Sequence, residues 1–182
     1  MILSKPAILE EHKKGNILYY SPIGHTIEGF TKNQSVDIHI GNWIYFPIVD
    51  QWVDLSIEIQ GLIIPAQTFF LAYTEEFIGT SSNSNIHPQF HQRSTLARLG
   101  LSHTKAGWGD VGFCNRWCME FYALIPFKLQ ANMRVGQISF SNASQSYQGY
   151  AEETGNYQSS SDLEVVIKNW SREDIKPKSG NC

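Results

Sequence analysis

The arrangement of apolar residues between residues 17 and 77 most constrains what this chain can fold into. Short runs rich in Ile, Val, Tyr, Phe and Trp are separated there by Gly, Pro, Asn and Asp. β-Branched and aromatic residues favour strands, whereas the separating residues favour turns. Similar runs follow between residues 112 and 140. The sequence therefore predicts a mainly β fold, built as a sandwich or a barrel.

Helical patterns are expected near both ends of the chain. Residues 4–15 begin with Ser4 as a cap candidate, place Pro6 in the first turn and end in basic residues and Gly15, as a short helix does. Residues 161–170 carry a cap pair and apolar residues at a helical period. Residues 79–85 are polar and predict a loop. The length of 182 residues fits one domain spanning residues 1–182.

Residues 116–122 place a carboxylate among aromatic residues. In a strand of period two, Trp117, Met119 and Phe121 would share one face, and Glu120 would lie on the other face with polar neighbours. Desolvation raises the pKa of such a carboxyl group toward the range useful for proton transfer. Glu120 is therefore either an acid–base group or an exposed strand residue in an ion pair, because structural ion pairs shift pKa values too.

The segment before this strand, residues 92–101, predicts a short helix. Ser94 is a candidate N-cap, Leu96, Ala97 and Leu99 suit the helix interior, and Gly100 suits its end. Ser94 and Arg98 are four residues apart and would share one face, near N–H groups that favour an anion. A phosphate site and an ordinary capped surface helix both fit this pattern.

Residues 105–113 form a turn-rich stretch that contains Asp110. Its glycines allow positive φ angles and close approach of a ligand to the main chain. The pattern indicates a binding loop, with a plain glycine-rich connection as the alternative, in which Asp110 only shapes a turn.

Together these segments resemble the dCTP deaminases, which share their fold with the trimeric dUTPases. The likeness covers most of the chain, with its blocks in the same order. The stronger blocks are residues 93–101 (RSTLARLGL), 106–113 (AGWGDVGF), 119–122 (MEFY) and 132–140 (NMRVGQISF). Weaker matches lie at residues 2–4, 35–41 and 69–77.

The resemblance implies a distorted β-barrel or jelly-roll sandwich of the dUTPase-like type, with short N- and C-terminal helices. It implies a homotrimer whose sites draw residues from more than one chain, and a mobile lid formed by residues 141–160. The implied reaction is hydrolytic deamination of dCTP to dUTP and ammonia. It would need no catalytic metal, and Mg²⁺ would be bound through the nucleotide phosphates.

The resemblance also implies roles for individual residues. Glu120 would be the general base that activates water, and Ser94 and the Ala106 carbonyl would hold that water or the cytosine amino group. Arg98 would stabilise charge, and Asp110 would contact the deoxyribose. The remaining substrate-binding residues that it implies are Arg93, Thr95, Leu96, Ala97, Trp108, Cys118, Met119, Gln137, Tyr150, Asn156 and Tyr157.

The chain departs from the family pattern mainly in the lid. Asn156 stands where a phosphate-binding Lys is common, and a neutral Asn cannot supply that charge. Two alternatives stand beside the deaminase. One is a bifunctional enzyme that continues to dUMP and pyrophosphate, or a dUTPase, in which Asp110 would activate water. The other is a catalytically silent nucleotide-binding protein on the same fold.

Composition excludes several other classes of protein. The net charge is −3 and the pI about 6.0, which argues against a nucleic-acid partner. No apolar run approaches the roughly 18 residues of a membrane helix, and the N-terminus lacks the layout of a signal peptide. Neither a nucleic acid nor a membrane is expected as a partner, and residence in the cytoplasm, of a bacterium, an archaeon or an infected host, is expected.

A zinc-dependent deamination site is not predicted. None of the six histidines is followed by x-Glu, and no C-x-x-C is present. Cys114, Cys118 and Cys182 are wrongly spaced for a structural zinc and are expected to be free thiols. His87 and His91 could share a metal on a helical face, but a loop around Pro88 argues against it.

Overall fold

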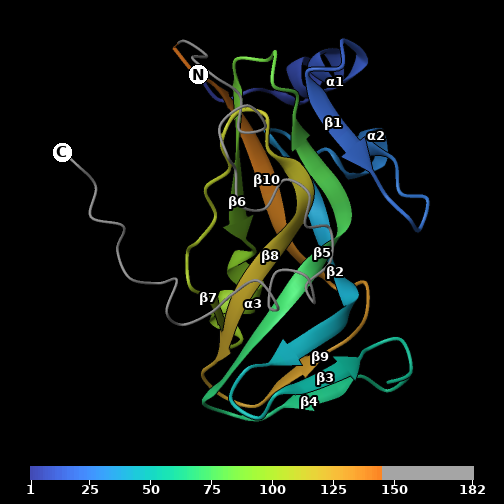
Figure 1. Ribbon diagram of the computed structural model, residues 1–182, viewed down its shortest axis with the longest axis vertical. Coiled ribbons are helices and arrows are strands. Elements are labelled where there is room, and N and C mark those ends of the chain that lie inside the picture. The colour runs from blue at the N-terminus through green and yellow to red at the C-terminus, as the bar shows by residue number, and fades with distance from the viewer. Residues whose placement is uncertain (145–182) are drawn as a thin grey trace, which may run out of the picture.

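The computed structural model describes residues 1–144 and contains mainly antiparallel strands (Figure 1). The strands are β1 (Ile17–Tyr20), β2 (Ser35–Phe46), β3 (Gln51–Asp54), β4 (Leu62–Ile64), β5 (Thr68–Thr80), β6 (Ile86–Gln92), β7 (Leu101–His103), β8 (Cys114–Ala123), β9 (Phe127–Leu129) and β10 (Arg134–Asn142). The helices are α1 (Lys5–Lys13), α2 (Ile27–Phe30) and α3 (Ser94–Arg98). The prediction of a mainly β fold is confirmed.

One large sheet carries most of the structure. Its strands follow the order β6-β10-β2-β5-β8-β7, and β1 and β3 pair with β5 and β2 in addition. A separate two-stranded sheet joins β4 and β9. The large sheet curls into a nearly closed barrel, with α1, α2 and β1 toward one end and β3, β4 and β9 at the other (Figure 1). Long strands that pair along most of their length hold the site residues on a stiff frame.

The core is formed by the inward faces of these strands. In β8, buried and half-buried residues alternate from Cys114 to Ala123, as the period-two prediction requires. Phe121 packs against Phe70 of β5 with ring centroids 5.5 Å apart, and both side chains are fully buried. Burial of large aromatic side chains is the dominant stabilising term in such a core.

Two segments differ from the sequence-based expectation. Residues 86–92 form β6 although they contain Pro88, because β6 is the last strand of the sheet on that side. A proline that lacks an N–H is tolerated at such an edge. The predicted loop at residues 79–85 is shorter, because Gly79 and Thr80 end β5 and only a turn separates them from β6.

Two of the predicted helices, at residues 4–15 and 92–101, are confirmed with adjusted boundaries. α1 has Ser4 at its N-cap position and Gly15 beyond its end, as expected. α3 is correctly placed, but its N-cap is Arg93 rather than Ser94, and Leu99 caps it at the other end. Among the described residues, no helix has both the length and the apolar character needed to cross a membrane.

Residues 141 and 142 finish β10 and do not begin a separate segment. The rest of the lid prediction from residue 145 onward, the helix predicted at residues 161–170, and Cys182 lie outside the described residues.

Candidate functional site

β8 turns Glu120 away from the core. Trp117, Met119 and Phe121 are buried on one face of the strand, whereas Glu120 lies on the half-buried opposite face with Cys118. The relative solvent exposure of the Glu120 side chain is 27%. The strand pairs with β5 on one side, where Glu120 is opposite Leu71, and with β7 on the other. The backbone of Glu120 is therefore fixed from both sides, and its carboxyl group projects to a partly open surface.

The Glu120 carboxyl group is poorly solvated. Its Oε2 atom is buried and has no hydrogen-bond partner within residues 1–144. Burial raises the pKa of Glu120 above its ordinary value, against smaller opposing effects of its own backbone N–H and the Thr104 side chain. A carboxyl group with a raised pKa can both take and return a proton near neutral pH.

His103 is the nearest ionisable neighbour of Glu120. Its Nε2 lies 3.5 Å from Glu120 Oε2, and its Nδ1 accepts a hydrogen bond from the Lys105 backbone N–H at 3.1 Å. The proton of the neutral ring must therefore sit on Nε2, which faces the carboxylate. Burial lowers the pKa of His103 to about 4, so that the ring is neutral at pH 7. Nε2 is itself buried without a hydrogen-bond partner among the described residues, so the neutral ring presents an unused donor 3.5 Å from Glu120 Oε2.

Sequence reasoning did not single out His103. It lies in β7, a three-residue strand too short to give a periodic pattern. Its ring packs edge-on against Phe90 and Phe121, with centroids 4.7 and 5.6 Å away. Gln92 accepts the His103 backbone N–H, which anchors β7 to the end of β6. These contacts hold the imidazole in one orientation.

The loop from residue 104 to residue 113 lies along the edge of β6. Gly107 accepts the Phe90 N–H at 2.8 Å and the Gly109 N–H donates to Pro88 at 3.2 Å. A Cβ at Gly107 would meet the Phe90 carbonyl oxygen at 2.6 Å, so that only glycine allows this approach. The loop is thereby fixed to the sheet, with Ala106 exposed on its outer side.

Trp108 and Asp110 form the exposed tip of this loop. The Trp108 side chain donates from Nε1 to Asp110 Oδ1 at 2.9 Å, and its ring lies 4.0 Å from the ring of His87. Trp108 keeps 70% of its exposure. An exposed tryptophan next to a carboxylate is available to stack against a ring or sugar of a ligand.

α3 presents the predicted anion-binding residues at the surface. Ser94, Thr95, Ala97 and Arg98 are exposed, whereas Leu96 is buried in the core. Within the described part of the chain, Arg98 makes no ion pair, and neither Ser94 nor Arg98 contacts Glu120 by a hydrogen bond or ion pair. A single chain therefore does not bring the predicted hydroxyl, guanidinium and carboxylate into contact.

The other predicted substrate-binding residues have mixed placements. The Met119 side chain is fully buried in the core, so a ligand can meet this residue only at its main chain. Cys118 lies on the Glu120 face, where burial raises the pKa of its thiol. Gln137 of β10 accepts a hydrogen bond from Ser35, and Arg93 is half-buried. Tyr150, Asn156 and Tyr157 lie outside the described residues.

The metal alternative at His87 and His91 finds no support in this fold. Both residues lie on β6, where residues four apart are separated by about 13 Å along the strand. His91 Nε2 is hydrogen-bonded to Ser139 at 2.9 Å. Cys114 and Cys118 are free thiols, as predicted.

The contact between His103 and Glu120 predicts a specific change in pH dependence. If Glu120 acts as a base it must be ionised, so the acidic limb of a profile of kcat/KM against pH would report its pKa. Replacing His103 by Leu removes the Nε2–H donor and is expected to shift this limb to higher pH, because the ionised carboxylate loses a stabilising partner. His103→Gln keeps a donor and is expected to shift the limb less. If His103→Leu and His103→Gln gave the same profile of kcat/KM against pH, a role of His103 in positioning Glu120 would be contradicted.

Comparison with known proteins identifies relatives of this chain. A family model described as dCTP deaminase-like matches residues 2–143. A protein of Clostridium botulinum (strain Eklund 17B / Type B) is 31% identical over 137 residues, which cover 75% of this chain and 72% of that protein. A protein of Hydrogenobaculum sp. (strain Y04AAS1) is 31% identical over 152 residues, covering 77% of this chain and 81% of that protein. Both are named "dCTP deaminase, dUMP-forming".

A solved structure has the same fold. It is the 2'-deoxycytidine 5'-triphosphate deaminase from Agrobacterium tumefaciens, with a TM-score of 0.63 and 16% sequence identity. The match covers 78% of this chain but only 48% of that longer chain. At this level of identity the likeness concerns the fold alone.

Proposed function

Because the chain belongs to the dCTP deaminase-like family, we propose that it deaminates dCTP by hydrolysis, with Glu120 as the general base. One observation carries this proposal. Glu120 is a desolvated carboxyl group with a raised pKa, and it lies beside the neutral imidazole of His103. An ordinary strand glutamate would instead be solvated or paired with a cation.

Hydrolytic deamination of cytosine requires proton transfers that one carboxylate can perform. Glu120 takes a proton from water as the oxygen forms its bond to C4 of the cytosine ring. It delivers this proton to N3, where the proton remains in the product. Glu120 then passes the remaining hydroxyl proton to the amino nitrogen, so that the C4=O bond forms as the C4–N bond breaks and ammonia leaves. General acid–base help of this kind contributes about 10²–10⁴-fold to the rate. Positioning of the ring and water supplies further acceleration.

The remaining site residues would orient the nucleotide around this carboxylate. Ser94 and the Ala106 carbonyl would hold the water or the amino group, and Arg98 would stabilise charge near the reacting centre. Trp108 and Asp110 would contact the sugar, which agrees with their exposed position at the loop tip. The nucleotide would bring Mg²⁺ on its phosphates as part of the substrate.

We propose that the complete site forms between subunits of a homotrimer. The exposure of Ser94 and Arg98, and the lack of a contact between them and Glu120 in residues 1–144, support this arrangement. In a ring of heterologous contacts, α3 of one subunit can meet β8 of the next.

The names of the relatives favour a second step in which the triphosphate is hydrolysed to dUMP. Incubation with dCTP, and separately with dUTP, distinguishes the products when ammonia and pyrophosphate are measured independently. Ammonia and pyrophosphate released in equal amounts from dCTP indicate the dUMP-forming enzyme, whereas ammonia with dUTP indicates a deaminase alone. Nucleotide binding without either product contradicts the proposed function.

Asp110 is the candidate residue for the second step, because its carboxylate is exposed next to Trp108. Asp110→Asn is expected to reduce pyrophosphate release from dUTP by about 10²-fold or more, the lower limit for loss of a general base. Ammonia release from dCTP should fall less. Chromatography of products from both substrates measures the two effects, and parallel losses would show that Asp110 serves binding alone.

A further inference from the structure

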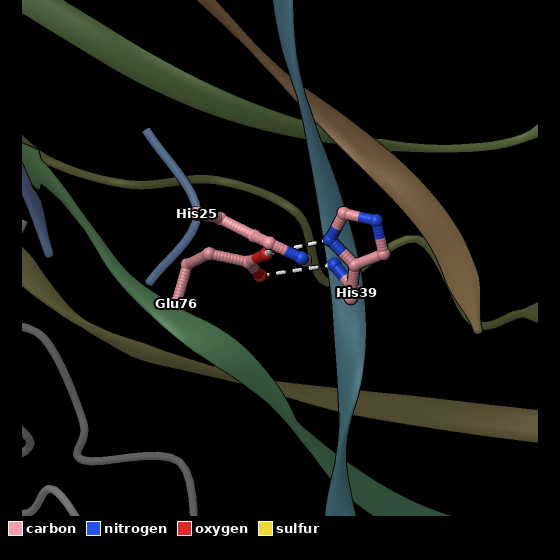
Figure 2. A group of neighbouring side chains, drawn as sticks. All are labelled: His25, His39 and Glu76. Atoms are coloured by element: carbon pink, nitrogen blue, oxygen red, sulfur yellow. Dashed lines mark hydrogen bonds and ion pairs between the residues drawn. The ribbon is translucent and has the colours of Figure 1, made fainter. Parts of the chain in front are cut away.

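Two histidines and a glutamate from separate segments meet inside the fold, away from Glu120. His25 follows β1, His39 lies in β2, and Glu76 lies in β5 (Figure 2). One possible ligand atom from each residue lies within 4.8 Å of the others. The Glu76 side chain is fully buried, that of His39 is nearly so, and that of His25 keeps 25% of its exposure. These residues form what we call the His25–His39–Glu76 cluster.

Among the described residues, no Lys or Arg side chain pairs with Glu76. The neighbouring Glu75 receives Arg116, whose Nη2 lies 3.3 Å from Glu75 Oε2. Glu76 instead accepts the His39 backbone N–H at 2.9 Å and contacts only imidazole nitrogens as ionisable partners among the described residues. A buried carboxylate is costly unless it is paired or bound to a metal ion.

Irregular strand pairing gives Glu76 this inward direction. The pairing of β5 shifts between Tyr73 and Phe77 toward β8, and the pairing of β2 shifts between Ile40 and Ile44 toward β5. Thr74, Glu75 and Glu76 are consequently all buried, although a regular strand would turn every second residue outward. Bulges of this kind re-aim side chains and are common beside functional sites.

Two polar atoms, one in the cluster and one beside it, lack a hydrogen bond within the described residues. His25 Nδ1 is buried, and its nearest ionisable partner is Glu76 Oε1 at 3.5 Å, beyond good hydrogen-bond distance. The buried hydroxyl of Tyr19 also has no well-formed partner. Burial and, to a lesser extent, the Glu76 carboxylate raise the pKa of Tyr19, which keeps the phenol protonated. A buried polar group without a partner calls for an explanation such as a bound ion.

We propose that the His25–His39–Glu76 cluster binds a divalent transition-metal ion of the Zn²⁺ class. Two imidazoles and one carboxylate are a ligand set that Zn²⁺ accepts in proteins, with a fourth position left for water. Ligand atoms around a tetrahedral Zn²⁺ are about 3.3 Å apart, given bonds of roughly 2.0–2.1 Å. The separation of 3.5 Å between His25 Nδ1 and Glu76 Oε1 is close to this value.

Metal binding requires local adjustment, because the three ligand atoms lie within 4.8 Å of one another rather than at about 3.3 Å. His39 Nδ1 and Glu76 Oε1 are 2.6 Å apart and share a hydrogen bond, which is too close for two ligands of one ion. Coordination through Nδ1 moves the proton of this ring to Nε2 and opens the contact by several tenths of an ångström. The partly exposed His25 provides the route by which the ion and its water enter.

Co²⁺ is a suitable probe, because its visible absorption reports the ligands. The untagged full-length protein is treated with a chelator, dialysed and titrated with Co²⁺, and then Zn²⁺ is added as competitor. We expect one Co²⁺ per chain, ligand-field bands without the charge-transfer band of a thiolate, and displacement by Zn²⁺. The expected absence of a thiolate band separates this site from Cys114 and Cys118, which are the free thiols of the described residues.

Variants make the assignment specific. His25→Gln is expected to weaken Co²⁺ binding by more than about 100-fold, since even loss of an outer hydrogen-bonding partner costs roughly 10–100-fold. His91→Gln removes an exposed imidazole on β6 and should bind as the wild type does. Glu76→Gln should also lose binding, and if it fails to fold, His25→Gln on its loop still decides the question.

Absence of Co²⁺ binding to the wild-type protein, or a difference of less than about tenfold between wild type and His25→Gln, overturns the proposal. The readout is metal affinity, so this result is independent of whether the protein deaminates dCTP.

Discussion

Replacing Glu120 by Gln is expected to lower ammonia release from dCTP by about 10²–10⁴-fold while nucleotide binding stays nearly unchanged. Gln has almost the same shape as Glu and keeps the contact with His103, but its amide cannot take a proton from water. Because Glu120 is held by strand pairing on both sides of β8, the substitution should not alter the fold. The loss should appear in kcat, measured by ammonia release, and not in KM.

The matched control is Glu10→Gln, which neutralises an exposed glutamate of α1 that pairs with Lys14. It should retain full activity. Equilibrium binding of dCTP to Glu120→Gln, followed by calorimetry, separates loss of chemistry from loss of affinity. Turnover of Glu120→Gln within a few-fold of the wild type would remove the central assignment.

Mixing two inactive variants is expected to restore activity if each site is shared between subunits. In a trimer formed at random from equal amounts of Glu120→Gln and Arg98→Ala chains, about one quarter of the sites contain both intact residues, given heterologous contacts. Ammonia release should therefore rise from near zero to about a quarter of the wild-type rate. Co-expression with two different affinity tags allows the mixed species to be isolated and its size measured.

A second mixture tests the geometry of this sharing. Ser94 and Arg98 both lie on α3, so a mixture of Ser94→Ala with Arg98→Ala contains no intact copy of that helix. This mixture should remain inactive where the first recovers. Equal behaviour of the two mixtures, or a monomeric protein, would contradict a site formed between β8 and the α3 of a neighbour.

Regular strands were predictable because their information is local. The alternation in β8 follows from a period of two and correctly turned Glu120 away from Trp117, Met119 and Phe121. The same argument could not find β7, which is too short for a period, nor β6, where Pro88 signals a break in a local pattern. Edge position in the sheet makes that proline acceptable, and edge position is a property of the whole fold.

The turn-forming residues of the sequence also predicted a loop correctly. The glycine-rich residues 105–113 do form a loop, and Gly107 approaches the Phe90 carbonyl as close packing of main chains requires. The cap of α3 was misplaced by one residue: Ser94 is of a favoured N-cap type, but Arg93 occupies that position and makes no side-chain capping hydrogen bond. Such boundaries depend on the direction in which the chain leaves β6, and the helix propensities of single residues do not describe that direction.

The amino-acid sequence alone was enough to establish a mainly β chain, the face of β8 that carries Glu120, and a family resemblance that names Ser94, Arg98, Asp110 and Glu120 as candidates. Folding added His103 next to Glu120 and gathered His25, His39 and Glu76 into one cluster. These residues have no periodic spacing along the chain. Strand pairing and bulges bring them together, because non-local hydrogen bonding, and not propensity, sets which distant residues become neighbours.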